Sequence, residues 1–188
     1  MSTVGNGRAA ALADMDADAA ATGTDVAHTV FDSPLGGLTL VAEGDALTGA
    51  YFEGQRHLPR RSFGPRRDGR FAEARRQLDE YFAGSRTCFD LPLAPRGEEF
   101  QLRVWQLLTE IPYGERRSYG QLARELGDPA LAQAVGAANG RNPLSVIVPC
   151  HRVVGADGSL VGYAGGLDRK RYLLELEEPA ERKAERLF

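Results

Sequence analysis

The chain has 188 residues, of which 43% are hydrophobic and 26% are charged, a composition typical of a folded protein with one or two small domains. Its formal net charge of -3 would argue against a nucleic-acid partner, but the charge is unevenly distributed, because eight arginines crowd one region: Arg56, Arg60, Arg61, Arg66, Arg67, Arg70, Arg75 and Arg76. Only two cysteines are present, which excludes the disulfide framework of a small secreted protein and predicts a cytoplasmic protein.

The first part of the chain predicts a tail followed by a small sheet. Residues 1–25 are low in complexity and have no large apolar cluster or basic leader, so we expect a disordered tail that is neither a signal peptide nor a membrane span. Residues 26–54 contain three β-like runs separated by the turn signals "SPLGG" and "EGD". This pattern predicts an antiparallel meander.

A helix and a short strand are predicted to complete the first domain. After an Arg-rich loop, apolar residues recur on one helical face and Gly84 ends the pattern. The residues of that face are Phe71, Ala74, Leu78, Tyr81 and Phe82. The stretch "TCFDLPLAPRG" predicts a last strand, with Cys88 packed in the core, and then a linker. We therefore predict an N-terminal domain over residues 26–95 and a second domain over residues 96–188.

The second half has a mostly helical pattern. A helix that includes Trp105 as a core residue is predicted from five apolar positions: Phe100, Val104, Leu107, Leu108 and Ile111. Ser118 is an expected N-cap for a short helix that ends at Gly127, and "ALAQAVGAANG" predicts another short helix of small residues. Two short helices joined by a tight turn indicate a helix-turn-helix unit, whose second helix would enter a DNA groove.

The stretch "VIVPCHRVVG" places Cys150 and His151 between apolar runs and leaves three interpretations open: a buried thiol, a metal ligand or a nucleophile. A lone cysteine in an apolar run is most often a small buried hydrophobe. On an extended chain neighbouring side chains point to opposite faces, so His151 is not expected to contact Cys150 directly. Pro149 before the cysteine and Arg152 after it suggest a shaped turn. With three histidines and no ligand-like spacing, we expect no metal site. Glu177 would by default be a solvated residue of the last helix.

Longer stretches of the second half resemble the O6-alkylguanine-DNA alkyltransferases. The similarity covers "FQLRVWQLLTEIPYGERRSYGQLA", "AVGAANGRNPLSVIVPCHRVVG" and "GYAGGLDRKRYLLELE", in order and with matching spacing, and "FDSPLGGLTL" resembles the start of the family's first domain. The resemblance implies an α+β fold: an N-terminal α/β domain with a small antiparallel sheet, similar to ribonuclease H, and a mostly helical C-terminal domain with a helix-turn-helix.

The resemblance also implies the chemistry of Cys150. This residue would be the nucleophile that takes the alkyl group from O6-alkylguanine, and from O4-alkylthymine, in a single turnover, and it would need to react as a thiolate. In the family a water links the cysteine to the histidine, here His151, and a glutamate, here Glu177, holds that histidine. Asn142 would brace the turn before the cysteine, and Tyr119 would act on the target phosphate and protonate the departing guanine.

Further positions are assigned to substrate and DNA by the same resemblance. Tyr163 would line the guanine pocket, the backbone of Cys150 and Val153 would read the base edge, and Lys170 and Arg152 match basic or structural positions near the site. The implied partner is the minor groove of double-stranded DNA with a flipped base, bound by a monomer without a cofactor.

Two positions depart from the family's pattern. Gln133 stands where the family usually has an arginine that fills the gap left by the flipped base, and Arg141 is the nearest alternative in sequence. Ala164 stands where some members have a serine.

Two other functions remain as alternatives. A non-enzymatic damage sensor of the same family would lack the cysteine, which is present here. A cysteine hydrolase built on Cys150, His151 and Glu177 would need an oxyanion-hole segment, which the sequence does not show, and would leave the paired short helices unexplained.

Overall fold

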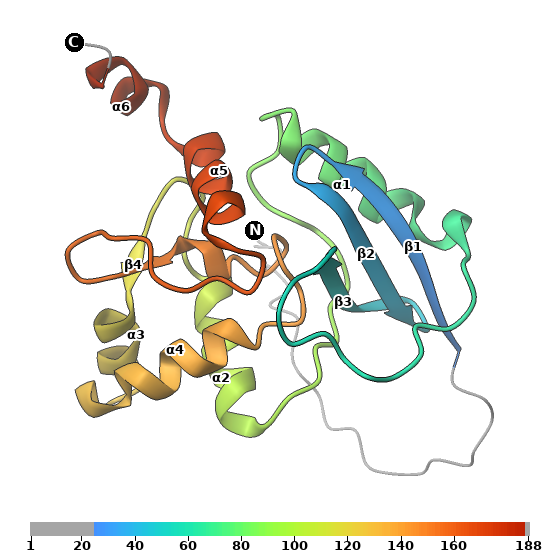
Figure 1. Cartoon of the computed structure of the whole chain (residues 1–188), viewed down its shortest axis with the longest axis horizontal. Helices are drawn as coiled ribbons and strands as arrows, with labels where there is room; N and C mark the ends of the chain where they lie inside the picture. The colour runs from blue at the N-terminus through green and yellow to red at the C-terminus, as the bar shows by residue number, and fades with distance from the viewer. Residues whose placement is uncertain (1–24, 187–188) are drawn as a thin grey trace, which may run out of the picture.

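The computed structural model describes residues 25–186, so the disordered tail predicted for residues 1–25 lies, except for Asp25, outside the described residues. The first half holds three strands and a helix, and the second half holds five helices with a two-stranded ladder (Figure 1). The elements are β1 (Val26–Ser33), β2 (Gly36–Glu43), β3 (Ala46–Phe52), α1 (Ala72–Phe82), α2 (Glu99–Thr109), β4 (Arg117–Ser118), α3 (Tyr119–Glu125), α4 (Ala132–Gly140), β5 (Val153–Val154), α5 (Leu167–Glu177) and α6 (Ala180–Glu185).

The sheet is the predicted antiparallel meander, in the order β1-β2-β3. Gly36 and Gly44, at the two turns, have φ values of 98° and 58°, a region that glycine adopts without strain. Helix α1 lies along one face of the sheet (Figure 1), and the fully buried side chains of Leu38, Phe52 and Leu78 belong to the core. The prediction for this part of the chain is confirmed.

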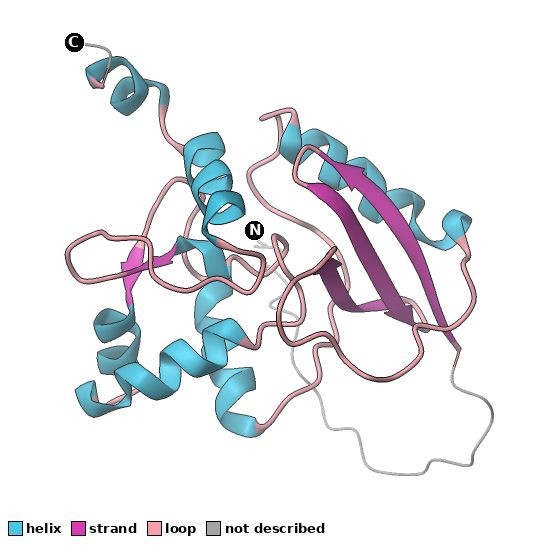
Figure 2. Ribbon diagram, in the orientation of Figure 1, coloured by secondary structure: helices cyan, strands magenta, loops and turns pink. Residues whose placement is uncertain are grey.

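The second half contains the predicted helix-turn-helix, formed by α3 and α4 (Figure 2). Ser118 is the N-cap of α3: its hydroxyl accepts a hydrogen bond from the Gln121 backbone N–H (3.1 Å), and the Gln121 side chain accepts one from the Ser118 N–H (2.7 Å). This reciprocal pair satisfies two amides that the helix itself leaves without partners. Trp105 is buried on α2 and donates from Nε1 to the carbonyl of Ala138 (2.8 Å), which ties α2 to α4.

The strand predicted in "TCFDLPLAPRG" does not form, and that prediction is wrong. The segment makes a single bridge to the sheet, between Leu47 and Leu93. Pro92 and Pro95 flank this bridge, and because proline has no N–H to donate, the pairing does not extend. Cys88 consequently lies exposed rather than in the core, which corrects a second prediction.

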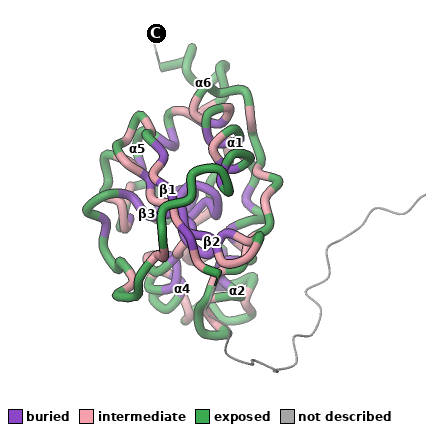
Figure 3. Tube along the Cα trace, turned by 90° about the vertical axis from the view of Figure 1, so that its right-hand side faces the viewer, coloured by how far each residue is buried: buried purple, intermediate pink, exposed green. Residues whose placement is uncertain are grey.

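The two halves are joined through β3 and through α5. Ala50 of β3 donates to the carbonyl of Pro143 (2.8 Å) and accepts from the N–H of Ser145 (3.0 Å), so the segment before Cys150 is bonded to the edge of the sheet. Arg169 of α5 lies over the ring of Phe52, 4.8 Å from its centroid. Buried residues of both halves belong to one hydrophobic cluster, and Figure 3 shows buried stretches in the sheet and in the helices of both halves. Within residues 25–186, no helix has the length and apolar character needed to cross a membrane.

Candidate active site

Cys150 begins a single turn of 3₁₀ helix, Cys150–Arg152, and its side chain is buried with 3% exposure. The backbone at Cys150 and His151 is therefore a turn, as the flanking Pro149 and Arg152 suggest, and not an extended strand. Proline fixes φ near the helical range, and Pro149 precedes the turn with φ -82° and accepts a hydrogen bond from the N–H of Arg152 (3.0 Å). The side chain of His151 is buried as well, with 0% exposure.

A braced and strained turn leads into this helix. Asn142 accepts a hydrogen bond from the N–H of Leu144 (3.0 Å) and donates from Nδ2 to the carbonyl of Val148 (2.9 Å). Between these two points Val146 has φ 73°, a conformation that costs energy for a β-branched residue. The structure therefore places Asn142 at the turn where the sequence analysis expects a bracing residue.

Glu177 is not the solvated residue expected by default on the last helix, because its exposure is only 2%. It lies instead at the centre of a buried hydrogen-bond network. Its carboxylate faces His151 Nε2 (2.8 Å) and accepts two hydrogen bonds from the guanidinium of Arg152 (2.8 and 2.9 Å). Tyr81 of α1, which lies in the first half of the chain, donates its hydroxyl hydrogen to the same carboxylate (2.6 Å).

Burial and charge set the protonation states of this network. Burial raises the pKa of the Cys150 thiol, against the smaller opposing effects of the Asn142 side chain and the charge of Lys170. Burial also lowers the pKa of His151, although Glu177 opposes the change. Burial disfavours the ionised form of Glu177, but His151 and Arg152 outweigh it and hold the pKa of Glu177 well below its usual range.

These directions describe a resting site with a neutral thiol, a neutral imidazole and an ionised carboxylate. Because ionised Glu177 can only accept, its hydrogen bond with His151 requires the imidazole proton to be on Nε2. Nδ1 then carries the lone pair, and within the described residues it has no hydrogen-bond partner. His151 is thus arranged to receive a proton at Nδ1 while Glu177 stabilises the resulting imidazolium.

A hollow, which we call the reactive pocket, opens beside Cys150. Its lining comprises Arg56, His57, Tyr119, Gly136, Asn139, Gly140, Gly162, Tyr163 and Ala164. Asn139 connects the pocket to the 3₁₀ turn that begins at Cys150, because its Nδ2 donates a hydrogen bond to the carbonyl of Cys150 (3.3 Å). The pKa values of Tyr119 and Tyr163 are raised, first by burial and then by the proximity of Cys150. Both tyrosines therefore remain protonated at neutral pH.

Lys170 and Tyr119 hold the glycine-rich loop that forms one wall of the pocket. Buried Lys170 donates to the carbonyls of Val153 (2.5 Å), Val161 (3.2 Å) and Gly162 (3.1 Å). Tyr119 also donates its hydroxyl hydrogen to the carbonyl of Val161 (2.7 Å). Burial lowers the pKa of Lys170 to about 8, with the Cys150 thiolate opposing the shift.

The residues expected to contact DNA lie at the surface. Gln133 is exposed in the first turn of α4, and Arg141 is exposed just after its last turn. The N–H of Val153 donates to Cys150 and its carbonyl accepts from Lys170, so the expected base-edge contact would use the remaining lone pair of that carbonyl.

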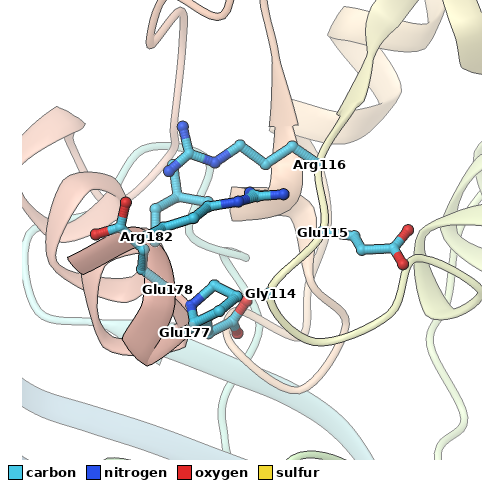
Figure 4. Close-up of a pocket in the computed structure, with 8 residues that line it drawn as sticks. Gly114, Glu115, Arg116, Glu177, Glu178 and Arg182 are labelled. Carbon is cyan, nitrogen blue, oxygen red and sulfur yellow. The ribbon is translucent and has the colours of Figure 1, made fainter. Parts of the chain in front are cut away.

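A second hollow borders Glu177 from another side (Figure 4). It is lined by Gly114, Glu115, Arg116, Leu174, Glu177, Glu178, Pro179 and Arg182. The side chains of Arg116 and Arg182 lie over it, and the carboxylate of Glu115 points away. The two hollows share no lining residue, so this one is separate from the reactive pocket.

Comparison with known sequences matches both halves of the chain to one family. Residues 26–95 match the domain described as "6-O-methylguanine DNA methyltransferase, ribonuclease-like domain", and residues 99–179 match "6-O-methylguanine DNA methyltransferase, DNA binding domain". The chain belongs to this family. The resemblance identified from the motifs, and the α+β fold class with a ribonuclease-like first domain, are confirmed.

Relatives in the 6-O-methylguanine DNA methyltransferase family are similar over most of the chain. The methylated-DNA--protein-cysteine methyltransferase of Mycobacterium tuberculosis is 52% identical over 151 residues, which cover 80% of this chain and 92% of the relative. The Methanosarcina acetivorans protein of the same name is 48% identical over 80% of this chain and 97% of its own length. The crystal structure of Mycobacterium tuberculosis OGT in complex with DNA superposes with a TM-score of 0.77, at 52% identity, over 80% of this chain and 92% of that one.

Several residues of the buried network and the pocket have no signal in the sequence. Tyr81 is predicted only as a core residue, Arg56 and His57 belong to a loop, and Asn139 belongs to a helix of small residues. No local spacing links Tyr81 to the network, since it is 96 positions from Glu177. For residues 25–186, no group of three His, Cys, Asp or Glu side chains is arranged to hold a metal ion, and the absence of a cofactor stays a prediction.

Proposed function

We propose that this chain repairs DNA by taking the alkyl group of O6-alkylguanine, and of O4-alkylthymine, onto Cys150 in a single turnover. Family membership gives the reaction class, the transfer of an alkyl group from DNA to a cysteine of the protein itself. One observation supports the choice of residue: Cys150 lies beside the reactive pocket, on the same 3₁₀ turn as a histidine whose second nitrogen is held by ionised Glu177.

The proposed step is a displacement at the alkyl carbon. The thiol proton passes to His151, the Cys150 sulfur bonds to the alkyl carbon, and the carbon–O6 bond breaks with its electron pair moving onto the base. The leaving guanine takes up a proton, for which Tyr119 is the proposed donor. The thioether product has no simple reversal, so each molecule acts once.

We further propose that the substrate is double-stranded DNA, read from the minor groove by α4 with the damaged base flipped into the reactive pocket. An alkylated base inside a duplex could not reach a buried thiol, so flipping is physically required. The Mycobacterium tuberculosis relative has been crystallised with DNA, which supports a DNA partner. We also propose that the protein acts as a monomer in the cytoplasm.

The test is incubation of the protein with a duplex oligonucleotide that carries O6-methylguanine, followed by intact-mass measurement and peptide mapping. One methyl group per protein, located on Cys150, is the expected outcome. Repeated turnover with no mass change would indicate the hydrolase alternative. Tight binding of the lesion with no transfer would indicate the damage sensor. Either of these two results would contradict the proposal.

Glu177→Gln is expected to slow alkyl transfer at neutral pH by roughly tenfold or more, because it lowers the pKa of His151. Each unit of that decrease makes His151 a tenfold weaker base for the thiol proton. Ionised Glu177 raises the pKa of His151, and the neutral amide would not. The deficit should shrink as the pH rises and the thiol ionises without help. Single-turnover rates from about pH 6 to about pH 10 measure it. A deficit that stays constant over this range would mean that Glu177 has only a structural role.

Gln133→Arg is expected to speed repair of a lesion in duplex DNA. Flipping costs a few kcal/mol of pairing and stacking, and arginine fills the resulting gap with a long planar cation that suits the negative minor groove. Repair of the free alkylated base, which needs no flipping, should hardly change. The measurement is the single-turnover rate of both proteins on both substrates.

Gln106→Arg is the matched control, because Gln106 is an exposed glutamine on α2 and its replacement adds the same charge. If Gln133→Arg leaves the duplex rate unchanged or lowers it, another residue fills the gap, and exposed Arg141 is the next candidate.

A further inference from the structure

The reactive pocket is built partly by the first half of the chain. The loop after β3 supplies Arg56 and His57 to a lining that otherwise comes from residues 119–164. This loop is fixed in place, because the backbone N–H of Arg56 donates to the carbonyl of Ala164 (2.9 Å) in the opposite wall. Gln55 anchors it from the other side by accepting a hydrogen bond from the N–H of Phe52 (2.6 Å). Arg56 and His57 are thus held across the pocket from α4.

The pocket is small. Its volume is about 100 Å³, whereas pockets that take drug-sized molecules have roughly 300–1,000 Å³. A larger hollow of about 380 Å³ lies next to it and is lined by Gly54, Arg56, Gly162, Tyr163, Ala164, Gly165, Gly166 and Leu167. Four residues belong to both linings and stand at the boundary between the small pocket and the larger space: Arg56, Gly162, Tyr163 and Ala164. Arg56 is the one of these that comes from the first half of the chain.

His57 lines the pocket and is exposed, and it has a backbone conformation that side chains rarely adopt, with φ 60°. The pKa of His57 is lowered, first by partial burial and then by the charges of Arg141 and Arg56, so the ring is neutral at pH 7. Asn139 and Gly140, at the end of α4, line the same pocket as His57. The loop and the end of α4 therefore form one rim.

We propose that Arg56 and His57 set the size of the alkyl group that the reactive pocket accepts, favouring methyl over bulky aryl adducts. This inference rests on the proposed function, since it concerns the same alkyl transfer to Cys150. Its physical basis is steric. A benzyl group on O6 needs space beyond that of a methyl group, and of the fixed loop Arg56 lies at the boundary with the adjoining hollow while His57 lines the small pocket alone.

The test compares two free bases, O6-methylguanine and O6-benzylguanine, as alkyl donors to the full-length protein. Free bases remove flipping and phosphate contacts, so the charge of Arg56 cannot act through DNA. His57→Gly suits the positive φ and removes only the imidazole. Arg56→Ala removes the guanidinium but keeps the N–H that bonds Ala164. Arg60→Ala is the control, because Arg60 is an exposed arginine of the same loop and lines neither hollow.

The readout is the ratio of the single-turnover rate with the benzyl base to the rate with the methyl base. His57→Gly and Arg56→Ala are each expected to raise this ratio by about tenfold or more over that of the wild type, the scale on which pockets discriminate small differences in size. Arg60→Ala should leave it unchanged. An unchanged or lowered ratio in both pocket variants, with methyl transfer intact, overturns this inference alone. Absence of transfer from either base to wild-type Cys150 would instead contradict the proposed function.

Discussion

Replacement of Cys150 by alanine is expected to abolish alkyl uptake while leaving lesion binding and the fold intact. In the proposed step the sulfur is the only atom that bonds to the alkyl carbon, and no other group near the pocket can substitute for a thiolate. Removal of one buried sulfur atom is expected to reduce the free energy of unfolding by about 1 kcal/mol, as for other small deletions in a core. Alanine is preferable to serine, because a buried hydroxyl without a partner would add its own cost.

The measurement for Cys150→Ala is intact mass after incubation with an O6-methylguanine duplex, together with lesion binding in a gel-shift assay. Cys88→Ala is the matched control and should retain full uptake, since Cys88 is exposed and lies outside the reactive pocket. Stoichiometric methylation of the Cys150→Ala protein, or a methyl group mapped to Cys88 in the wild type, would show that the nucleophile has been assigned to the wrong residue.

Arg152→Met is expected to reduce the free energy of unfolding by about 3–5 kcal/mol, the cost of leaving one member of a buried ion pair alone. Methionine replaces the aliphatic volume of the arginine but none of its donors. The guanidinium makes two hydrogen bonds to the Glu177 carboxylate and one to the carbonyl of Ile111 (2.6 Å). Without it, a carboxylate with 2% exposure would keep only His151 and Tyr81 as partners.

Urea unfolding near neutral pH and in acid measures this effect. The pKa of Glu177 is depressed in the folded protein, so its ion pair contributes stability above the unfolded pKa of about 4.3, and that stability is lost as the pH falls further. The difference between wild type and Arg152→Met should therefore shrink below about pH 4. Arg171→Met, which breaks an exposed pair with Asp168, is the control and should cost less than about 1 kcal/mol. Equal losses for both variants would contradict the prediction.

The elements that could be predicted from sequence are those that depend on local chemistry. The three strands follow from alternating apolar residues and from turns that need glycine, and α3 begins where Ser118 can cap it. The short strand containing Cys88 could not form for an equally local reason, the prolines at 92 and 95, which the sequence analysis treated only as part of a linker.

The reactive site was only partly accessible to such reasoning. Cys150 and His151 are noticeable in the sequence itself, but their expected roles came from the resemblance, as did Glu177, which lies 26 positions from His151 and carries no periodic signal of that contact. A turn at Cys150 is suggested by the flanking Pro149 and Arg152, but the contacts that hold it are not local: Ala50 bonds the preceding segment and Asn142 braces it. Arg56 and His57 reach the pocket only through the packing of one half of the chain on the other.

The hydrogen bond from Tyr81 to Glu177 makes the two halves thermodynamically dependent on each other. The carboxylate that supports the chemistry of the second half obtains part of its solvation from a phenol of the first. Separation of the halves would leave an acidic group and a hydroxyl exposed on complementary apolar faces, each without the partner it was buried with. The first half of the chain therefore contributes to the stability of the network in the second half. Local unfolding of either half would break this hydrogen bond and disturb the network beside Cys150. The geometry of the reactive centre therefore depends on both halves being folded.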